Sequence, residues 1–234
     1  MKVEDEGLFL YSKNFGESSK ILYILSKDNG LLKGLCRYSK NKKSNLINFD
    51  KIKFIWSSRN KDSLGFVNVE PQQGNSIDNY LFSIIKASAS ELCIKFLPLW
   101  EKNVEIYNNV LELSNLKKNI EFFLIKKYVS WEIEFLKNLG YQLDINFCSV
   151  SGKKGDTFFI SPKTGNAVSF DVGEKYSKRL FKIPLCMKEN FKKDFYPDYC
   201  EALQITGFFF FKILENRKQK FIFRNQLISY IKGL

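Results

Sequence analysis

Short apolar, β-rich runs separated by polar turn signals make up about the first third of the chain, and in the run 51–56 apolar and polar residues alternate. These runs are residues 7–13, 19–26, 31–38, 51–56 and 64–69. Asp28-Asn29-Gly30 is typical of a β-hairpin, because Asn-Gly accommodates the positive φ of a tight turn, and Pro71 ends the series. Five short strands predict a small closed barrel. An OB-fold is the commonest architecture of this kind, although other five-stranded barrels fit the count equally well.

The hydrophobic period changes to three- and four-residue steps after residue 74, which predicts helices. The predicted helices cover residues 76–97, 102–113, 118–139, 201–214 and 221–231. Ser76 is the expected N-cap of the first helix, and Gly140 the expected C-cap of the third.

The segment 141–171 interrupts the helical pattern. Residues 157–161 and 166–170 flank a Pro-Lys-Thr-Gly turn and predict a β-hairpin. The predicted fold class is therefore α+β, with an N-terminal OB-fold β-barrel followed by an α-helical domain that carries an inserted β-hairpin module. We expect the barrel domain to span residues 1–74 and the helical domain residues 75–234, with the insertion at about 141–171.

The composition favours a polyanionic partner and argues against an enzyme. The chain has 37 Lys and Arg against 25 Asp and Glu, a net charge of +12, which indicates nucleic acid first and an anionic membrane second. It is also rich in Lys, Asn, Ile and Phe, as proteins of AT-rich genomes are, so the placement of the charges carries more weight than their total. The absence of histidine removes the commonest general base and metal ligand, and no phosphate-binding GxxxxGK[ST] loop occurs. We predict no catalytic activity and no cofactor.

The cysteine pattern and the chain start favour a cytosolic protein. The five cysteines are scattered and odd in number, which suits reduced thiols in a cytosol. No apolar run approaches the roughly 20 residues of a membrane helix, and the acidic start is unlike a secretory signal. We therefore expect no membrane partner.

Two stretches without acidic residues are candidate DNA-binding sites. The first, between Asp28 and Asp50, contains Lys33, Arg37, Tyr38, Lys40, Lys42 and Lys43. Basic side chains there can follow a phosphate backbone while Tyr38 offers a stacking face, although a solvated lysine-rich loop is the alternative. The second, after Glu215, places Arg217, Lys220 and Arg224 at helical spacing; a solvated last helix explains it at least as well.

Four segments resemble a known family. They are GLFLYSKNFGESSKILYILSKDNGLLKGLCR (7–37), WSSRNKDSLGFVNVE (56–70), YVSWEIEFLKNLGYQLDINFCSVSG (128–152) and FFISPKTGNAVS (158–169). Together they are similar to the RecO family of recombination mediators in its alphaproteobacterial form, over nearly the whole chain. The third segment is specific, whereas the first would be modest evidence by itself.

The resemblance implies an OB-fold followed by a helical domain. It implies binding of single- and double-stranded DNA, annealing of complementary strands, and loading of RecA onto strands coated by single-strand-binding protein (SSB), without nucleotide hydrolysis. The implied partners are RecR, the acidic C-terminal tail of SSB and, in some members, RecF, in a cytoplasmic, nucleoid-associated setting.

The resemblance also implies site residues. Arg37, Lys40 and Lys43 match basic positions of the family pattern. Arg59, Arg179 and Arg224 fall where the most similar subfamily tends to have arginine. We expect Arg59 to contact phosphate. Arg179, Arg217 and Arg224 are candidates for DNA or an acidic protein tail.

The chain departs from the family pattern in two places. Many members have a four-cysteine zinc module in the central segment, whereas here only Cys148 remains and Ser151 stands where its partner would be. We therefore expect a hairpin without metal. Tyr38 replaces a usual glycine, which puts the geometry of that loop in doubt.

The alternative functions are a generic OB-fold RNA-binding protein and a scaffold that binds only protein.

Overall fold

The computed structural model describes most of the chain as two compact units. The described residues are 1–37, 46–72, 79–116, 120–155, 157–188, 195–214 and 220–234. The first unit comprises Met1–Lys118 and Phe221–Leu227, and the second comprises Asn119–Lys220 and Ile228–Leu234. No helix among the described residues is long and apolar enough to cross a membrane.

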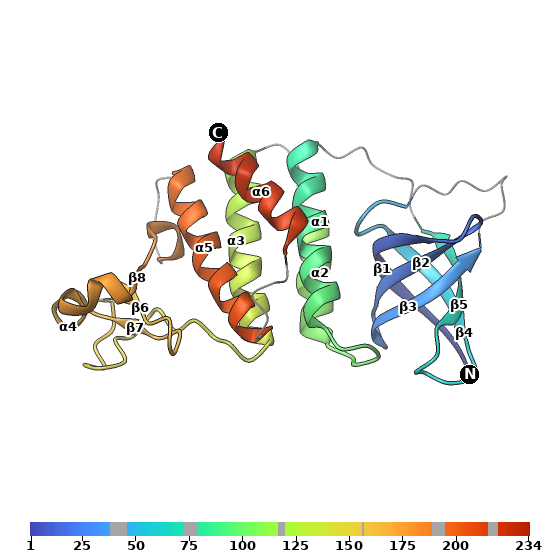
Figure 1. The fold of residues 1–234 in the computed structure, drawn as a ribbon, viewed down its shortest axis with the longest axis horizontal. Helices are drawn as coiled ribbons and strands as arrows, with labels where there is room; N and C mark the ends of the chain where they lie inside the picture. The colour runs from blue at the N-terminus through green and yellow to red at the C-terminus, as the bar shows by residue number, and fades with distance from the viewer. Residues whose placement is uncertain (38–45, 73–78, 117–119, 156, 189–194, 215–219) are drawn as a thin grey trace. The chain divides into compact units, whose positions relative to one another are not determined.

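A closed five-stranded barrel opens the first unit (Figure 1). Its strands are β1 (Lys2–Phe15), β2 (Ser19–Ser26), β3 (Gly30–Arg37), β4 (Lys51–Ser57) and β5 (Gly65–Pro71), in the order β1-β2-β3-β5-β4. Neighbouring strands are antiparallel except β3 and β5, which are parallel. The long β1 pairs with β4 through its first half and with β2 through its second, which closes the barrel. This barrel, followed by a helical region, confirms the predicted fold class.

Trp56 lies at the centre of the barrel core. Its side chain is fully buried, and its indole N–H donates to the carbonyl oxygen of Lys33 at 3.0 Å. Gly34 and Gly65 make room for the ring, because a Cβ at these positions would lie 3.0 and 2.3 Å from its atoms. Trp100 packs edge-on against Trp56, with ring centroids 4.5 Å apart. The two glycines are thus needed for this large side chain to fit.

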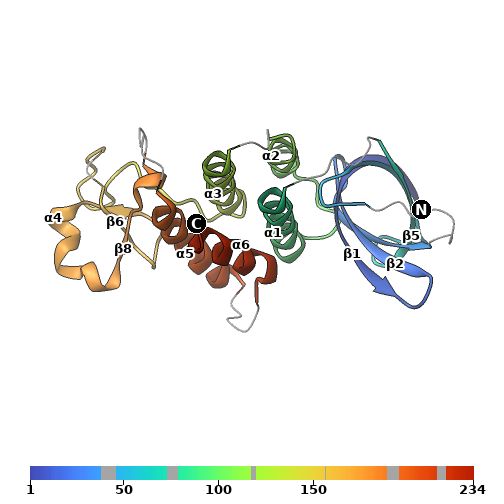
Figure 2. The ribbon, with the colours of Figure 1, turned by 90° about the horizontal axis from the view of Figure 1, so that it is seen from above.

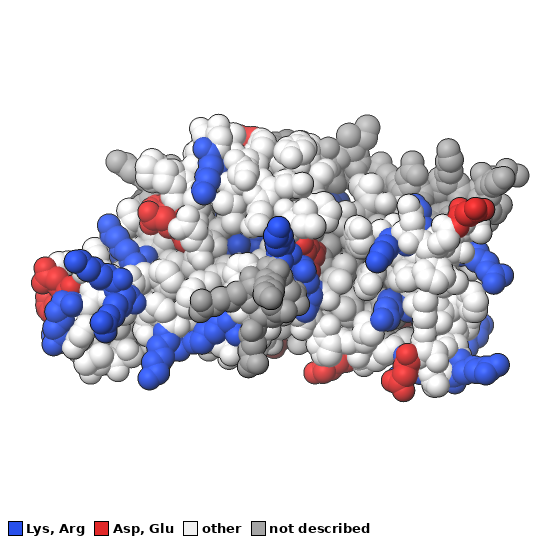
Figure 3. All heavy atoms as spheres, in the orientation of Figure 1, with Lys and Arg blue, Asp and Glu red and all other residues white. Residues whose placement is uncertain are grey.

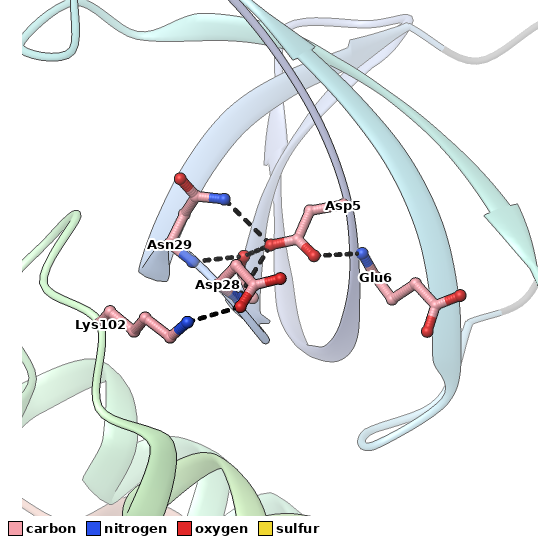
Figure 4. Close-up of polar contacts among 6 residues, drawn as sticks. Asp5, Glu6, Asp28, Asn29 and Lys102 are labelled. Carbon is pink, nitrogen blue, oxygen red and sulfur yellow. Dashed lines mark hydrogen bonds and ion pairs between the residues drawn. The ribbon is translucent and has the colours of Figure 1, made fainter.

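Asp5 fixes the turn between β2 and β3 (Figure 4). Its carboxylate accepts hydrogen bonds from the Ser26 hydroxyl, the Asp28 amide and the Asn29 side chain. Burial alone would raise the pKa of Asp5, but these hydrogen bonds outweigh it and lower the pKa below its ordinary value. Lys102 forms an ion pair with Asp28 at 2.6 Å, which ties the turn to the segment before the second helix.

Helices α1 (Tyr80–Phe96) and α2 (Val104–Ser114) follow the barrel. Both begin at an asparagine cap: Asn79 accepts from the Phe82 amide at 2.8 Å, and Asn103 from the Ile106 amide at 2.9 Å. The predicted cap Ser76 lies outside the described residues, and the described helix begins at Tyr80.

Helix α6 (Ile222–Lys232) begins in the first unit. The Glu91 carboxylate accepts from the amides of Ile222, Phe223 and Arg224 at 2.7, 3.0 and 3.2 Å. A carboxylate at this position satisfies amides that have no partner within the helix and favours its positive end.

The second unit pairs helix α3 (Glu121–Asn138) with helix α5 (Tyr196–Ile213), which lie side by side (Figure 2). A buried Glu132 joins them, because it accepts from the Tyr128 hydroxyl at 2.6 Å and from the Thr206 hydroxyl. The C-cap of α3 is Leu139, and Gly140, the predicted C-cap, is the next residue, with a φ of 85°.

A small sheet lies between α3 and α5 in the sequence. Strands β6 (Phe159–Ile160), β7 (Ala167–Val168) and β8 (Phe181–Lys182) form it in the order β7-β6-β8, with helix α4 (Phe170–Gly173) and the 3-10 helix η1 (Glu174–Arg179) between β7 and β8. The strands β6 and β7 pair antiparallel around the predicted turn. A separate inserted module, like the domain boundary at residue 74, stays a prediction.

Candidate nucleic-acid interface

Three neighbouring strands of the barrel bring basic and aromatic side chains to one outer surface. Leu22, Ile24 and Leu32 belong to the barrel core, so the residues that alternate with them on β2 and β3 point outward. The strand pairing then sets three outward rows across β1, β2 and β3. These rows are Tyr11–Tyr23–Lys33, Lys13–Ile21–Leu35 and Phe15–Ser19–Arg37.

The aromatic members of this surface are accessible. Tyr11, Phe15 and Phe66 are between 41% and 52% exposed, and the ring centroids of Tyr11 and Tyr23 lie 6.4 Å apart. The Arg37 guanidinium lies 5.1 Å from the ring centroid of Phe66, which is paired with Leu35 across β3 and β5. We call the set the barrel face. It consists of Tyr11, Lys13, Phe15, Tyr23, Lys33, Arg37 and Phe66.

The predicted DNA-binding residues fall in different places. Lys33 and Arg37 belong to the barrel face, and Arg59 is exposed between β4 and β5. Arg179 is exposed at the end of η1, in the second unit. Tyr38, Lys40, Lys42, Lys43 and Arg217 lie outside the described residues.

Arg224 does not fit the prediction that it contacts DNA. It lies on α6 as expected, but it is only 3% exposed. A buried guanidinium has no surface to offer a phosphate backbone, so we leave Arg224 out of the interface. Helical spacing grouped Arg224 with Lys220, but Lys220 is exposed and precedes α6, so the spacing did not show which residues the helix buries.

Five members of the barrel face were missed from the sequence: Tyr11, Lys13, Phe15, Tyr23 and Phe66. These residues are spread singly over β1, β2 and β5, so they form no cluster of charge along the chain. The available signal was alternation within each run, because Ile21 and Tyr23 occupy the same side of β2. Alternation alone does not say which side faces the core.

Negatively charged side chains lie on the outer surface of β1, β4 and β5. There the first half of β1 contributes Glu4 and Glu6, and β5 contributes Glu70, around a groove of about 320 Å³ whose lining includes Lys53 and Ile55. We call these five residues the acidic face. Its net negative charge repels phosphate, so of these two described surfaces the barrel face is the one suited to a polyanion.

Cys148, the remaining cysteine of the zinc pattern, lies in a hydrogen-bonded turn. Its sulfur accepts from the amides of Ser151 at 3.4 Å and Ser169 at 3.3 Å. The Ser151 side chain, then its amide, and Ser169 lower the pKa of the Cys148 thiol to about 6, against the opposing effect of burial. One thiol with serine hydroxyls does not fit a structural zinc site, and among the described residues no three metal-ligating side chains come together.

Sequence comparisons relate both parts of the chain to one protein family. The family description "Recombination protein O N terminal" matches residues 1–74, and "Recombination protein O C terminal" matches residues 83–209. Similar relatives named DNA repair protein RecO occur in Wolbachia pipientis subsp. Culex pipiens, with 31% identity over 92% of each chain, and in Ehrlichia chaffeensis, with 30% identity over 99% of this chain and 98% of the relative. A relative of the same name in Rickettsia bellii is 28% identical over 99% and 97%.

Proposed function

Because the chain belongs to the recombination protein O family, we propose that it is a recombination mediator that binds single- and double-stranded DNA and anneals complementary strands. The family gives it a role in DNA repair and recombination, and the names of the family and its relatives state no catalysed reaction.

The barrel face is the observation that supports DNA binding. Lysine and arginine side chains release counterions when they contact phosphates, which favours binding of any sequence. Exposed aromatic rings between them can stack on unpaired bases, as the sheet surface of OB-folds does. Annealing needs only charge neutralisation and transient alignment of two strands, and no residue on this surface has to act as an acid or base.

We propose RecR, the acidic tail of SSB and, in some settings, RecF as protein partners, and loading of RecA onto SSB-coated strands as the outcome. The second unit has an apolar pocket of about 560 Å³ that could receive an aromatic tail residue. Its lining includes Phe122, Tyr196, Ile231 and Lys232. This proposed function would place the protein in the cytoplasm, on the nucleoid.

The test is annealing of two complementary oligonucleotides without ATP. The wild-type protein should accelerate annealing, and a Lys33→Ala, Arg37→Ala variant should lose most of that acceleration. Lys53→Ala on the acidic face is the matched control, because it removes an exposed positive charge from the same barrel. A protein that neither binds nor anneals DNA would refute the proposal, and a clear preference for RNA of equal length would favour the RNA-binding alternative.

A further inference from the structure

Lysine ammonium groups lie over aromatic rings around the small sheet of the second unit. Lys182 and Lys188 lie 5.4 and 5.6 Å from the ring centroid of Phe158. Lys175 lies 5.2 Å from the ring centroid of Tyr176 on η1. Such pairs place a positive charge beside the ring, where it can contact a negatively charged group of a ligand that binds there.

The rings in this region are also accessible to a ligand. Phe170 meets Phe158 edge-on at 5.2 Å, and Phe170 and Tyr176 are 42% and 51% exposed. Exposed apolar side chains that form a patch mark interaction surfaces.

The surroundings are basic. Residues 141–188 contain eight Lys and Arg against four Asp and Glu. Figure 3 shows several lysine and arginine side chains gathered over the part of the chain that carries α4, β6 and β8 in Figure 1. The surface therefore attracts a polyanion, as the barrel face does.

We propose that this surface is a second binding site for single-stranded DNA, so that one protein molecule can hold two strands. We call it the second-unit patch. It consists of Phe158, Phe170, Lys175, Tyr176, Lys182 and Lys188. The inference rests on the proposed function and extends it, because annealing requires that two strands be brought together and the barrel face accounts for one.

Single-stranded DNA fits the patch better than an acidic peptide does. The lysines would hold either ligand through its negative charges. A single strand, however, carries a flat base with every phosphate, whereas an acidic peptide carries few rings, so a strand can stack on both Phe170 and Tyr176. Stacked bases with phosphates beside Lys175 and Lys182 therefore use both features of the surface.

The experiment uses the full chain and two non-complementary oligonucleotides, one carrying a donor dye and one an acceptor dye. Energy transfer reports two strands on one protein, at concentrations where light scattering shows a single copy in each complex. The patch variant is Lys175→Ala, Tyr176→Ala, which removes one exposed lysine–aromatic pair. The matched control is Phe123→Ala, Lys127→Ala, which removes an equivalent pair on α3, with the ammonium 5.7 Å from the ring centroid.

We expect the wild-type protein and the control to show energy transfer. The patch variant should bind the first strand unchanged but the second about tenfold more weakly, as loss of one stacking ring predicts. Unchanged energy transfer in the patch variant would overturn the inference and leave the proposed function intact. A patch variant that still binds both strands but no longer binds an acidic peptide would also overturn the inference. A wild-type protein that binds no strand would overturn both.

Discussion

Charge and stacking on the barrel face can be separated, because they affect DNA binding in different ways. A charge variant would carry Lys13→Ala, Lys33→Ala and Arg37→Ala. A stacking variant would carry Tyr11→Ala and Tyr23→Ala, whose rings are neighbours on β1 and β2. Both variants change outward-facing side chains, so the barrel core remains intact.

The expected magnitudes follow from the number of groups removed. Each lost phosphate contact with a single strand makes the negative slope of log affinity against log salt shallower by about 0.7. The loss of three contacts therefore makes it shallower by about 2. Each lost stacking contact costs about 1–3 kcal/mol, which is about 5- to 150-fold in affinity, and leaves the salt slope unchanged because no charge is removed.

The assay is fluorescence anisotropy of a labelled oligothymidine titrated at several salt concentrations between about 50 and 200 mM. Lys53→Ala on the acidic face is the control, and its slope should match the wild type. If Lys53→Ala lowered the slope as much per charge as the charge variant does, DNA would not be confined to the barrel face. If the stacking variant bound as well as the wild type, the aromatic rings would have no part in binding.

Three further predictions concern stability and protonation. Gly65→Ala should destabilise the protein by about 1–3 kcal/mol in urea unfolding, since its Cβ would lie 2.3 Å from Trp56; Gly233→Ala, whose Cβ meets nothing closer than 3.4 Å, should not. Asp5→Ala should lower the free energy of unfolding by about 1–3 kcal/mol at neutral pH. Because the pKa of Asp5 is lowered in the folded protein, the stability that its carboxylate adds should be lost as the pH falls through that pKa. An equal loss of stability from the substitution at acidic pH would contradict this reasoning. Thiolate absorbance should rise near pH 6 in the wild type and not in Cys148→Ser, and the stability that this thiolate adds should be lost as the pH falls through about 6.

The barrel could be predicted from the sequence largely because its turns are encoded locally. The Asn29-Gly30 pair marks the β2–β3 hairpin, and the apolar β-forming run of β2 and the alternation in β4 identify strands. The first half of β1 was missed, because residues 2–6 are mostly charged and have low strand propensity. They form a strand because they pair with β4, where Val3 is opposite Trp56, and this is a long-range contact that no local pattern contains.

The candidate site was less predictable than the fold. Charge density along the chain selected Lys33 and Arg37, and the structure places both on the outer side of β3, with Leu35 between them on that side. It also selected Arg224, which the packing of α6 buries. Which charges share a surface depends on strand register and helix packing, and neither is determined by spacing along one segment.

The two surfaces of opposite charge on the barrel both use β1, and a single irregularity separates them. In the first half of the strand Glu4 and Glu6 point outward, opposite Ile55 and Lys53. The register shifts between Phe9 and Tyr11, so that Phe9 faces the core while Tyr11, and not the preceding residue, is the next to point outward beside Tyr23.

Without this extra residue, strict alternation from Glu4 and Glu6 would carry Ser12 and Asn14 to the outer surface and turn Tyr11, Lys13 and Phe15 toward the core. The bulge therefore decides whether β1 contributes to the barrel face at all. It also explains why hydrophobic alternation along β1, taken as one uninterrupted strand, could not reveal the barrel face. The inward and outward sides of the strand exchange between the half that carries Glu4 and Glu6 and the half that carries Tyr11, Lys13 and Phe15.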